Sequence, residues 1–108
     1  MHRLPPALAA TATPQILELL GDGPGRVLEL GFAGIHAMPL RLAGFDVVVV
    51  EADPAFRARA QERAGGVLAE VPVEAFDAVV APADADLSTV AAARVVLVAP
   101  DGTASMGE

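Results

Sequence analysis

The sequence contains no cysteine, lysine, tryptophan or tyrosine, and phenylalanine is its only aromatic residue, at four positions. Without cysteine the chain can form no disulfide bond, no thiolate metal site and no cysteine nucleophile. Histidine occurs only at positions 2 and 36, which argues against a zinc site. No apolar run approaches the roughly 18 residues that span a bilayer. These absences predict a soluble, cytoplasmic protein with no bound metal and no membrane partner.

Positive charge is also scarce. The chain has 14 Asp and Glu residues against 7 Arg, which gives a formal net charge of -7. Nucleic-acid binding depends on attraction between basic side chains and phosphates, so we expect no DNA or RNA partner. The chain is 54% hydrophobic, which is enough for one packed core, and its length of 108 residues leaves no room for a second domain. The sequence therefore predicts a single domain over 1–108, with flexible ends at 1–12 and 103–108.

Helical and extended segments alternate along the chain. The spacing of apolar residues predicts helices at 13–20, 35–43, 54–64 and 86–93, and strands at 26–30, 45–51, 66–70, 76–81 and 94–99. Thr13 and Asp53 each precede a proline, which is typical of a helix cap followed by the first helical residue. Short connections between alternating strands and helices require parallel pairing, so the pattern predicts a doubly wound α/β sheet.

One turn of this predicted sheet has features of a ligand site. In a doubly wound sheet, ligands bind beyond the carboxyl ends of the strands, where the strand order reverses. Here that place follows the first strand, in the turn Gly31-Phe32-Ala33-Gly34, and Glu51 ends the second strand 20 positions after Gly31. Glycine lets backbone approach a ligand closely, and a carboxylate at that strand end can accept hydrogen bonds from ribose hydroxyls. Together they predict a nucleoside-type pocket.

Several short motifs then suggest a family. Glu29-Leu30-Gly31 resembles the first motif of the class I S-adenosylmethionine-dependent methyltransferases. Glu51-Ala52-Asp53-Pro54 is similar to the family's ribose-binding acid and the helix start that follows it. Glu70-Val71-Pro72 is similar to the acidic segment after its third strand, and Phe76-Asp77 looks like the start of its fourth. The stretch 96–102 resembles its fifth strand.

The resemblance spans residues 14–102 and implies a three-layer Rossmann-like sandwich with five mainly parallel strands in the order 3-2-1-4-5. It implies that the antiparallel C-terminal hairpin of the family is missing. It also implies a cradle for S-adenosylmethionine or S-adenosylhomocysteine, formed by Glu29, Gly31, Phe32, Ala33, Gly34, Glu51, Ala52 and Glu70. Ala33 and Ile35 replace the family's second and third glycines, and no catalytic residue carries over.

Two other interpretations of the chain stay open. The turn at 31–34 and the stretch 43–49 are also similar to the start of β-hydroxyacid dehydrogenase domains, which implies nicotinamide or nucleotide binding. The departures from the first methyltransferase motif equally favour a degenerate, non-catalytic module for binding or oligomerisation. In either case the strand at 94–99 would lie at an open edge, apolar on both faces, so we expect a homodimer through this edge or the neighbouring helices.

Some of these residues also have a purely structural interpretation. Gly31 and Gly34 can simply turn the chain between a strand and a helix. The arginines at 57, 59 and 63 are expected to form a solvated helix face with Glu62. His36 is the one side chain near the turn that can titrate close to neutrality, as a structural residue or as a proton carrier.

Overall fold

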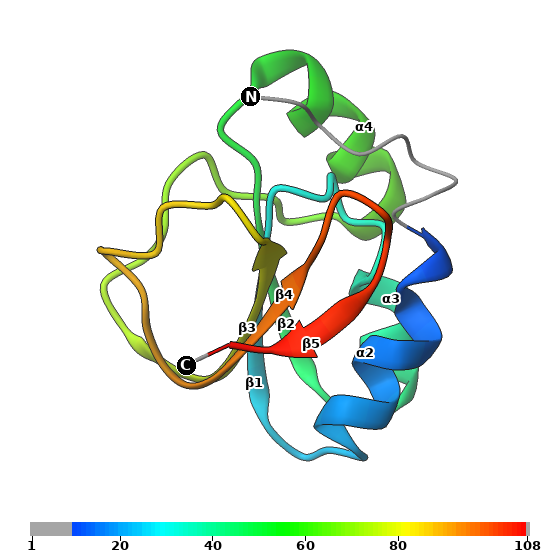
Figure 1. Cartoon of the computed structure of the whole chain (residues 1–108). Helices are drawn as coiled ribbons and strands as arrows, with labels where there is room; N and C mark the ends of the chain where they lie inside the picture. Colours follow the sequence, from blue (N-terminus) through cyan, green and yellow to red (C-terminus); the bar gives the residue numbers. More distant parts are fainter. Residues whose placement is uncertain (1–9, 108) are drawn as a thin grey trace.

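A computed structural model describes residues 10–107 and shows a five-stranded sheet with helices on one of its faces (Figure 1). The helices are α2 (Thr13–Leu20), α3 (Ala37–Leu42) and α4 (Pro54–Ala64), and the strands are β1 (Arg26–Leu30), β2 (Asp46–Val50), β3 (Ala75–Pro82), β4 (Ala91–Val98) and β5 (Ala104–Met106). The strand order is β2-β1-β3-β4-β5, and all pairs are parallel except the antiparallel β4–β5 pair. The α/β class and the mostly parallel sheet predicted from the sequence are confirmed. None of the helices described has the length and apolar character needed to cross a membrane.

The two predicted helix caps have different outcomes. Asp53 caps α4 as expected, because its side chain accepts a hydrogen bond from the Ala55 backbone N–H at 2.9 Å. The prediction for Thr13 is wrong, since Ala12 is the capping residue of α2 and makes no side-chain bond. Thr13 is instead hydrogen-bonded to His36, with 2.8 Å between its hydroxyl oxygen and Nδ1. The Thr13 hydroxyl thus connects α2 with the residue before α3, and it does not cap its own helix.

The helix predicted at 86–93 is absent from the structure. Residues 83–90 form turns, in which Asp86 accepts a hydrogen bond from the Ser88 backbone N–H at 3.0 Å, and Ala91–Ala93 begin β4. Ala91 and Ala92 lie in register with the first two residues of β3. Pairing with β3 therefore overrides the helix preference of this alanine run, because propensity is a weak prior next to tertiary contacts.

The strand predicted at 66–70 is reduced to one parallel bridge between Leu68 and Val50. The Leu68 N–H donates to the Val49 carbonyl and the Leu68 carbonyl accepts from the Glu51 N–H, both at 2.9 Å. The segment thus lies beside β2, where the predicted order places its third strand. Glycines with positive φ at 65 and 66 precede it, and they limit the extended stretch to a few residues.

The predicted absence of a C-terminal antiparallel hairpin is also wrong. Residues 96–98 of β4 pair with β5, so the strand expected at an open edge has neighbours on both sides. The Ala104 N–H of β5 donates to the Gln15 side chain of α2 at 2.8 Å, which occupies part of the new edge. Residues 104–106, within the end expected to be flexible, supply this strand, whereas 1–9 lie outside the described residues. The homodimer stays a prediction, but the open edge that motivated it is covered.

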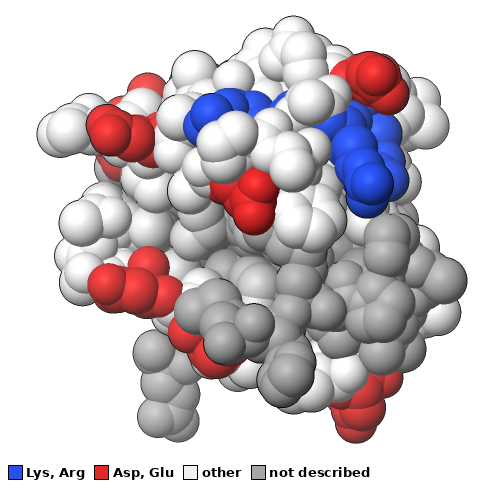
Figure 2. Space-filling model, turned by 90° about the horizontal axis from the view of Figure 1, so that it is seen from above, with Lys and Arg blue, Asp and Glu red and all other residues white. Residues whose placement is uncertain are grey.

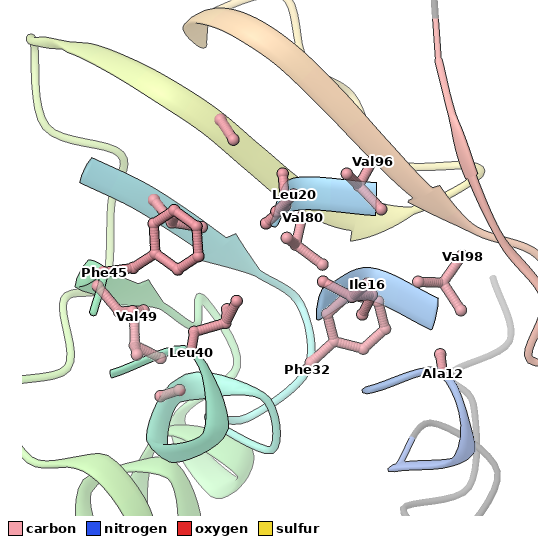
Figure 3. Close-up of a cluster of buried hydrophobic side chains, with 14 of the residues drawn as sticks. Ala12, Ile16, Leu20, Phe32, Leu40, Phe45, Val49, Val80, Val96 and Val98 are labelled. Atoms are coloured by element: carbon pink, nitrogen blue, oxygen red, sulfur yellow. The ribbon is translucent and has the colours of Figure 1, made fainter. Parts of the chain in front are cut away.

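The two faces of the sheet are covered differently. On the helix face, side chains of α2 and α3 such as Ile16 and Leu40 pack on Val49, Val80 and Val96 (Figure 3). The other face, which we call the loop face, has a small core of its own: Leu28, Val50, Phe76, Val79 and Ala81. Within residues 10–107 the loops at 65–74 and 83–90 cover it, and no helix does (Figure 1). The third layer implied by the resemblance is therefore missing from this part of the chain.

The helix-face core predicts a simple difference in stability. Ile16 is fully buried, so Ile16→Ala removes methyl groups and leaves a cavity, and we expect it to lower the free energy of unfolding by about 2–5 kcal/mol. Leu42 on α3 is 82% exposed, and Leu42→Ala is expected to change it by no more than about 0.5 kcal/mol. Urea unfolding followed by circular dichroism measures both. Equal losses would contradict the packing of α2 against the sheet.

Candidate functional site

The strand order reverses at β1. β1 lies between β2 and β3, so the chain passes from β1 to the neighbour on one side and returns to the neighbour on the other. In open α/β sheets this reversal creates the crevice in which ligands bind, outside the carboxyl ends of the strands. The turn at 31–36, Glu51 and Pro82 follow or end β1, β2 and β3 respectively, and therefore share this edge. The structure thus brings together the two main elements of the predicted pocket.

Gly31 links the three strands at this edge. Its N–H lies 3.4 Å from the Val50 carbonyl at the end of β2, a long hydrogen bond. Its φ is 80°, and a Cβ at this position would lie 3.3 Å from the Pro82 ring of β3. Glycine is required here both for its backbone conformation and for the approach of Pro82.

Helix α4 packs against the second half of the turn. Gly34 has a φ of 79°, and a Cβ there would lie 3.3 Å from the Ala64 side chain. Ala33 also has a positive φ, 53°, and its carbonyl accepts a hydrogen bond from Arg63 Nη1 at 3.0 Å. A left-handed conformation costs a non-glycine residue about 1–2 kcal/mol, so the contact with Arg63 helps to hold it.

The arginines of α4 agree only in part with the predicted solvated face: Arg59 and Arg63 are exposed, whereas Arg57 is half-buried. Arg63 donates to the turn after β1, and Arg57 Nη1 lies 3.3 Å from the Glu51 carbonyl after β2. The Arg59 guanidinium lies 5.8 Å from the centre of the Phe56 ring. Seen from above, arginine side chains lie in the upper half of the picture, with acidic side chains beside them (Figure 2). Two of the three arginines therefore fix the backbone of both loops at the candidate site.

Glu29 of β1 is a buried carboxyl that is hydrogen-bonded to the turn. It has no solvent exposure, and its Oε2 accepts a hydrogen bond from the His36 backbone N–H at 2.8 Å. Burial raises the pKa of this carboxyl to about 7, against the opposing effect of hydrogen bonds from the His36 and Gly34 backbones. Its other oxygen, Oε1, has no hydrogen-bond partner. Glu29 thus ties the residue that precedes α3 to β1.

His36 lies fully buried beside this carboxyl. Its Nδ1 is hydrogen-bonded to Thr13, its Nε2 has no partner, and its ring meets the Phe32 ring edge to face, with 4.7 Å between the centroids. Burial lowers its pKa to about 4, so the ring is neutral at pH 7. The expectation that His36 titrates close to neutrality is therefore wrong, and its contacts are those of a structural residue.

The remaining predicted cradle residues are divided between the interior and the surface. Phe32 is 3% exposed and points into the helix-face core near Ile16 (Figure 3). Glu51 is 2% exposed, and its Oε2 accepts from the Asp53 N–H at 3.2 Å. Ala52 and Glu70 are exposed, each on a loop that leaves the β2 side of the sheet. Within residues 10–107 no group of three or more His, Asp or Glu side chains is arranged to hold a metal ion.

The sequence did not reveal three residues that shape this site: Thr13, Arg63 and Pro82. Thr13 contacts a residue 23 positions away, and Arg63 one 30 positions away. Pro82 meets Gly31 across two paired strands. No local spacing signals contacts of this kind. Thr13 followed by proline even gave the competing pattern of a helix cap.

Glu29 and His36 predict opposite effects of pH on stability. The pKa of Glu29 is raised from 4.5 to about 7, so its protonated form stabilises the fold below pH 4.5 and this contribution is lost as the pH rises to about 7. The pKa of His36 is lowered from 6.5 to about 4, so its neutral form stabilises the fold above pH 6.5 and this contribution is lost as the pH falls to about 4. Each change amounts to about 3 kcal/mol. Between pH 4.5 and 6.5 the two oppose each other.

Single variants separate the two contributions. The free energy of unfolding of wild type minus that of Glu29→Gln is expected to fall by about 3 kcal/mol from pH 4.5 to 7. Wild type minus His36→Gln is expected to rise by about the same amount from pH 4 to 6.5. Urea titrations across this range measure both, and subtraction cancels the carboxylates that all three proteins share. Differences with the same sign of slope would show that the two groups are not buried as described.

Two glycines test the packing of α4 against the turn. Gly34→Ala and Gly66→Ala both place a side chain at positive φ, which costs about 1 kcal/mol or more each. Only at Gly34 does the new Cβ crowd α4, because nothing lies within 4 Å of a Cβ at Gly66. We therefore expect Gly34→Ala to lose about 1–3 kcal/mol more in urea unfolding. Equal losses would mean that α4 does not pack on the turn.

Comparison of the chain with models of known protein families gives no match, and comparison with curated proteins gives none. The likeness to class I methyltransferases therefore rests on the short motifs alone. The function of the site has to be argued from its geometry.

Proposed function

We propose that this chain is a minimal Rossmann-like protein that binds an adenosine-containing ligand, S-adenosylmethionine or S-adenosylhomocysteine, at the carboxyl ends of β1 and β2. The observation that carries the proposal is the reversal of strand order at β1. It places the Gly31 turn, the Glu51 strand end and Pro82 on one edge, where such folds bind nucleotides.

The residues at this edge fit parts of such a ligand. Glu51 stands at the end of β2, and its bond with the Asp53 N–H orients the carboxylate that would accept the ribose hydroxyls. Gly31 offers backbone without a side chain, and the exposed Ala52 and Glu70 would lie on the adenine side. Because the Glu51 carboxylate is 2% exposed, binding requires the chain around it to move. S-adenosylmethionine would supply an activated methyl group, whose in-line transfer depends chiefly on positioning.

A non-catalytic module is the second candidate, and a different observation favours it. The turn after β1 is filled by its own side chains, since Phe32 and His36 are buried and pack on each other. Arg63 fixes the same turn from α4. A turn closed in this way would serve the fold, and the protein would then act through its surface.

Calorimetric titration of the whole chain with S-adenosylhomocysteine decides between the two. We expect micromolar binding that weakens at least about tenfold in Glu51→Gln, because the variant loses the carboxylate for the ribose hydroxyls. Glu62→Gln removes the same charge from the exposed face of α4 and is expected to leave the affinity unchanged.

The contradicting results are equally specific. No heat with S-adenosylhomocysteine from a chain that is folded by circular dichroism would reject the cradle and support the module. Binding of NAD in its place would support the nicotinamide interpretation. Equal weakening in Glu51→Gln and Glu62→Gln would indicate general charge attraction rather than a site.

A further inference from the structure

The loop face of the sheet is apolar and incompletely covered. Its small core is buried, but Val48, Leu87, Val90 and Val95 around it are only partly buried. Parallel strands are normally covered on both faces by helices. In residues 10–107 the helices of this chain all lie on the opposite face, and the loop face is covered by the loops at 65–74 and 83–90 (Figure 1).

Two large apolar side chains are exposed on the loop that crosses this side. Val73 is fully exposed and Leu68 is 41% exposed. Val67 packs on the helix-face core and Val71 on the core of the loop face. Since side chains alternate along the extended stretch at the bridge, Leu68 points to the opposite side from Val67, toward the loop face. Leu68 therefore extends the apolar surface outward, and Val73 adds a second exposed apolar side chain further along the same loop.

Acidic residues outnumber basic ones on this side. Arg26 of β1 also lies here, with its guanidinium 5.8 Å from the centre of the Phe76 ring, but it is paired with both Asp46 and Glu74. Residues 64–93 contain five acidic residues and no arginine or lysine. Glu74 is paired with Arg26, whereas Glu70, Asp84 and Asp86 are exposed and form no ion pair with any residue in 10–107. The left margin of Figure 2, which is the side of these loops in Figure 1, shows acidic side chains and no arginine.

We propose that the loop face is a docking surface for a cationic amphipathic helix of a partner protein. The apolar stripe of such a helix would cover the partly buried valines and leucines, in the place of the missing helical layer. Its Lys and Arg residues would meet the unpaired carboxylates at the margin, which complement them in charge. A second copy of this chain would instead set acidic loops against acidic loops, which is unfavourable. The docking surface does not depend on ligand binding at β1.

A synthetic helical peptide tests this directly. The probe is a fluorescein-labelled peptide of leucine and lysine, with leucine at i, i+3, i+4 and i+7, and its control is a peptide of the same composition in scrambled order. Fluorescence anisotropy with the whole chain is expected to show saturable binding of the patterned peptide only, weakening as salt is added.

Matched variants locate the binding surface. Val73→Ser with Leu68→Ser is expected to weaken binding at least about tenfold, whereas Leu42→Ser, which removes an exposed leucine from α3, leaves it unchanged. Asp84→Asn with Asp86→Asn is expected to weaken it more than Asp22→Asn with Glu62→Gln, which changes the net charge equally at other exposed positions.

Four results would overturn the proposal. The first is no binding of the patterned peptide to a folded chain, and the second is equal binding of the scrambled peptide. The third is equal weakening by the matched variants, which would indicate attraction to the acidic chain as a whole. The fourth is a dimer in sedimentation that Val73→Ser dissociates, because a second copy would then occupy the loop face.

Discussion

The candidate site depends on one interaction, the hydrogen bond between the buried Glu29 carboxyl and the His36 backbone N–H. The carboxyl lies in the central part of the sheet, on the face that the helices cover, and binds the backbone of the turn at His36. That bond fixes where α3 begins, and it places the His36 ring against Phe32 and Thr13. Because a carboxyl inside a core is costly unless it is hydrogen-bonded, the turn and the carboxyl stabilise each other. The shape of the candidate site at the carboxyl ends of the strands therefore depends on this hydrogen bond.

The unequal cover of the two faces divides the molecule into parts with different roles. On the helix face, α2 and α3 bury large side chains such as Ile16 and Leu40, and α4 holds both loops of the candidate site through Arg57 and Arg63. The loop face has a small core and an acidic margin, with no such support. Helix contacts are thus concentrated on the side of the candidate site, and apolar surface is left where a partner helix would add a layer.

The sequence predicted the elements whose signals are local. The Asp53 cap with its proline, and the β-branched strand at 46–50, form as expected. The predictions failed where distant contacts decide: alanines 91–93 join β3 rather than a helix, and β5 closes a hairpin from a Gly-, Ser- and Thr-containing end. For the site, the spacing of Gly31 and Glu51 correctly placed both at one edge. The burial of Phe32 and the roles of Thr13 and Arg63 depend on the packing of α2 and α4, which no local pattern records.

Two buried polar atoms beside the turn after β1 have no partner within residues 10–107. Oε1 of Glu29 and Nε2 of His36 lack hydrogen-bond partners in the described chain, although most buried polar atoms in folded proteins have one. Burying a polar atom without a partner costs free energy. Burial also disfavours the charged form of each group, which raises the pKa of Glu29 and lowers that of His36. A movement that exposes the turn would return both atoms to water. Such a movement therefore costs less free energy than the packing of Phe32 and His36 alone suggests. The ligand of the proposed site needs the region around Glu51 to move. Its binding would cost less free energy if the same movement also exposed these two atoms.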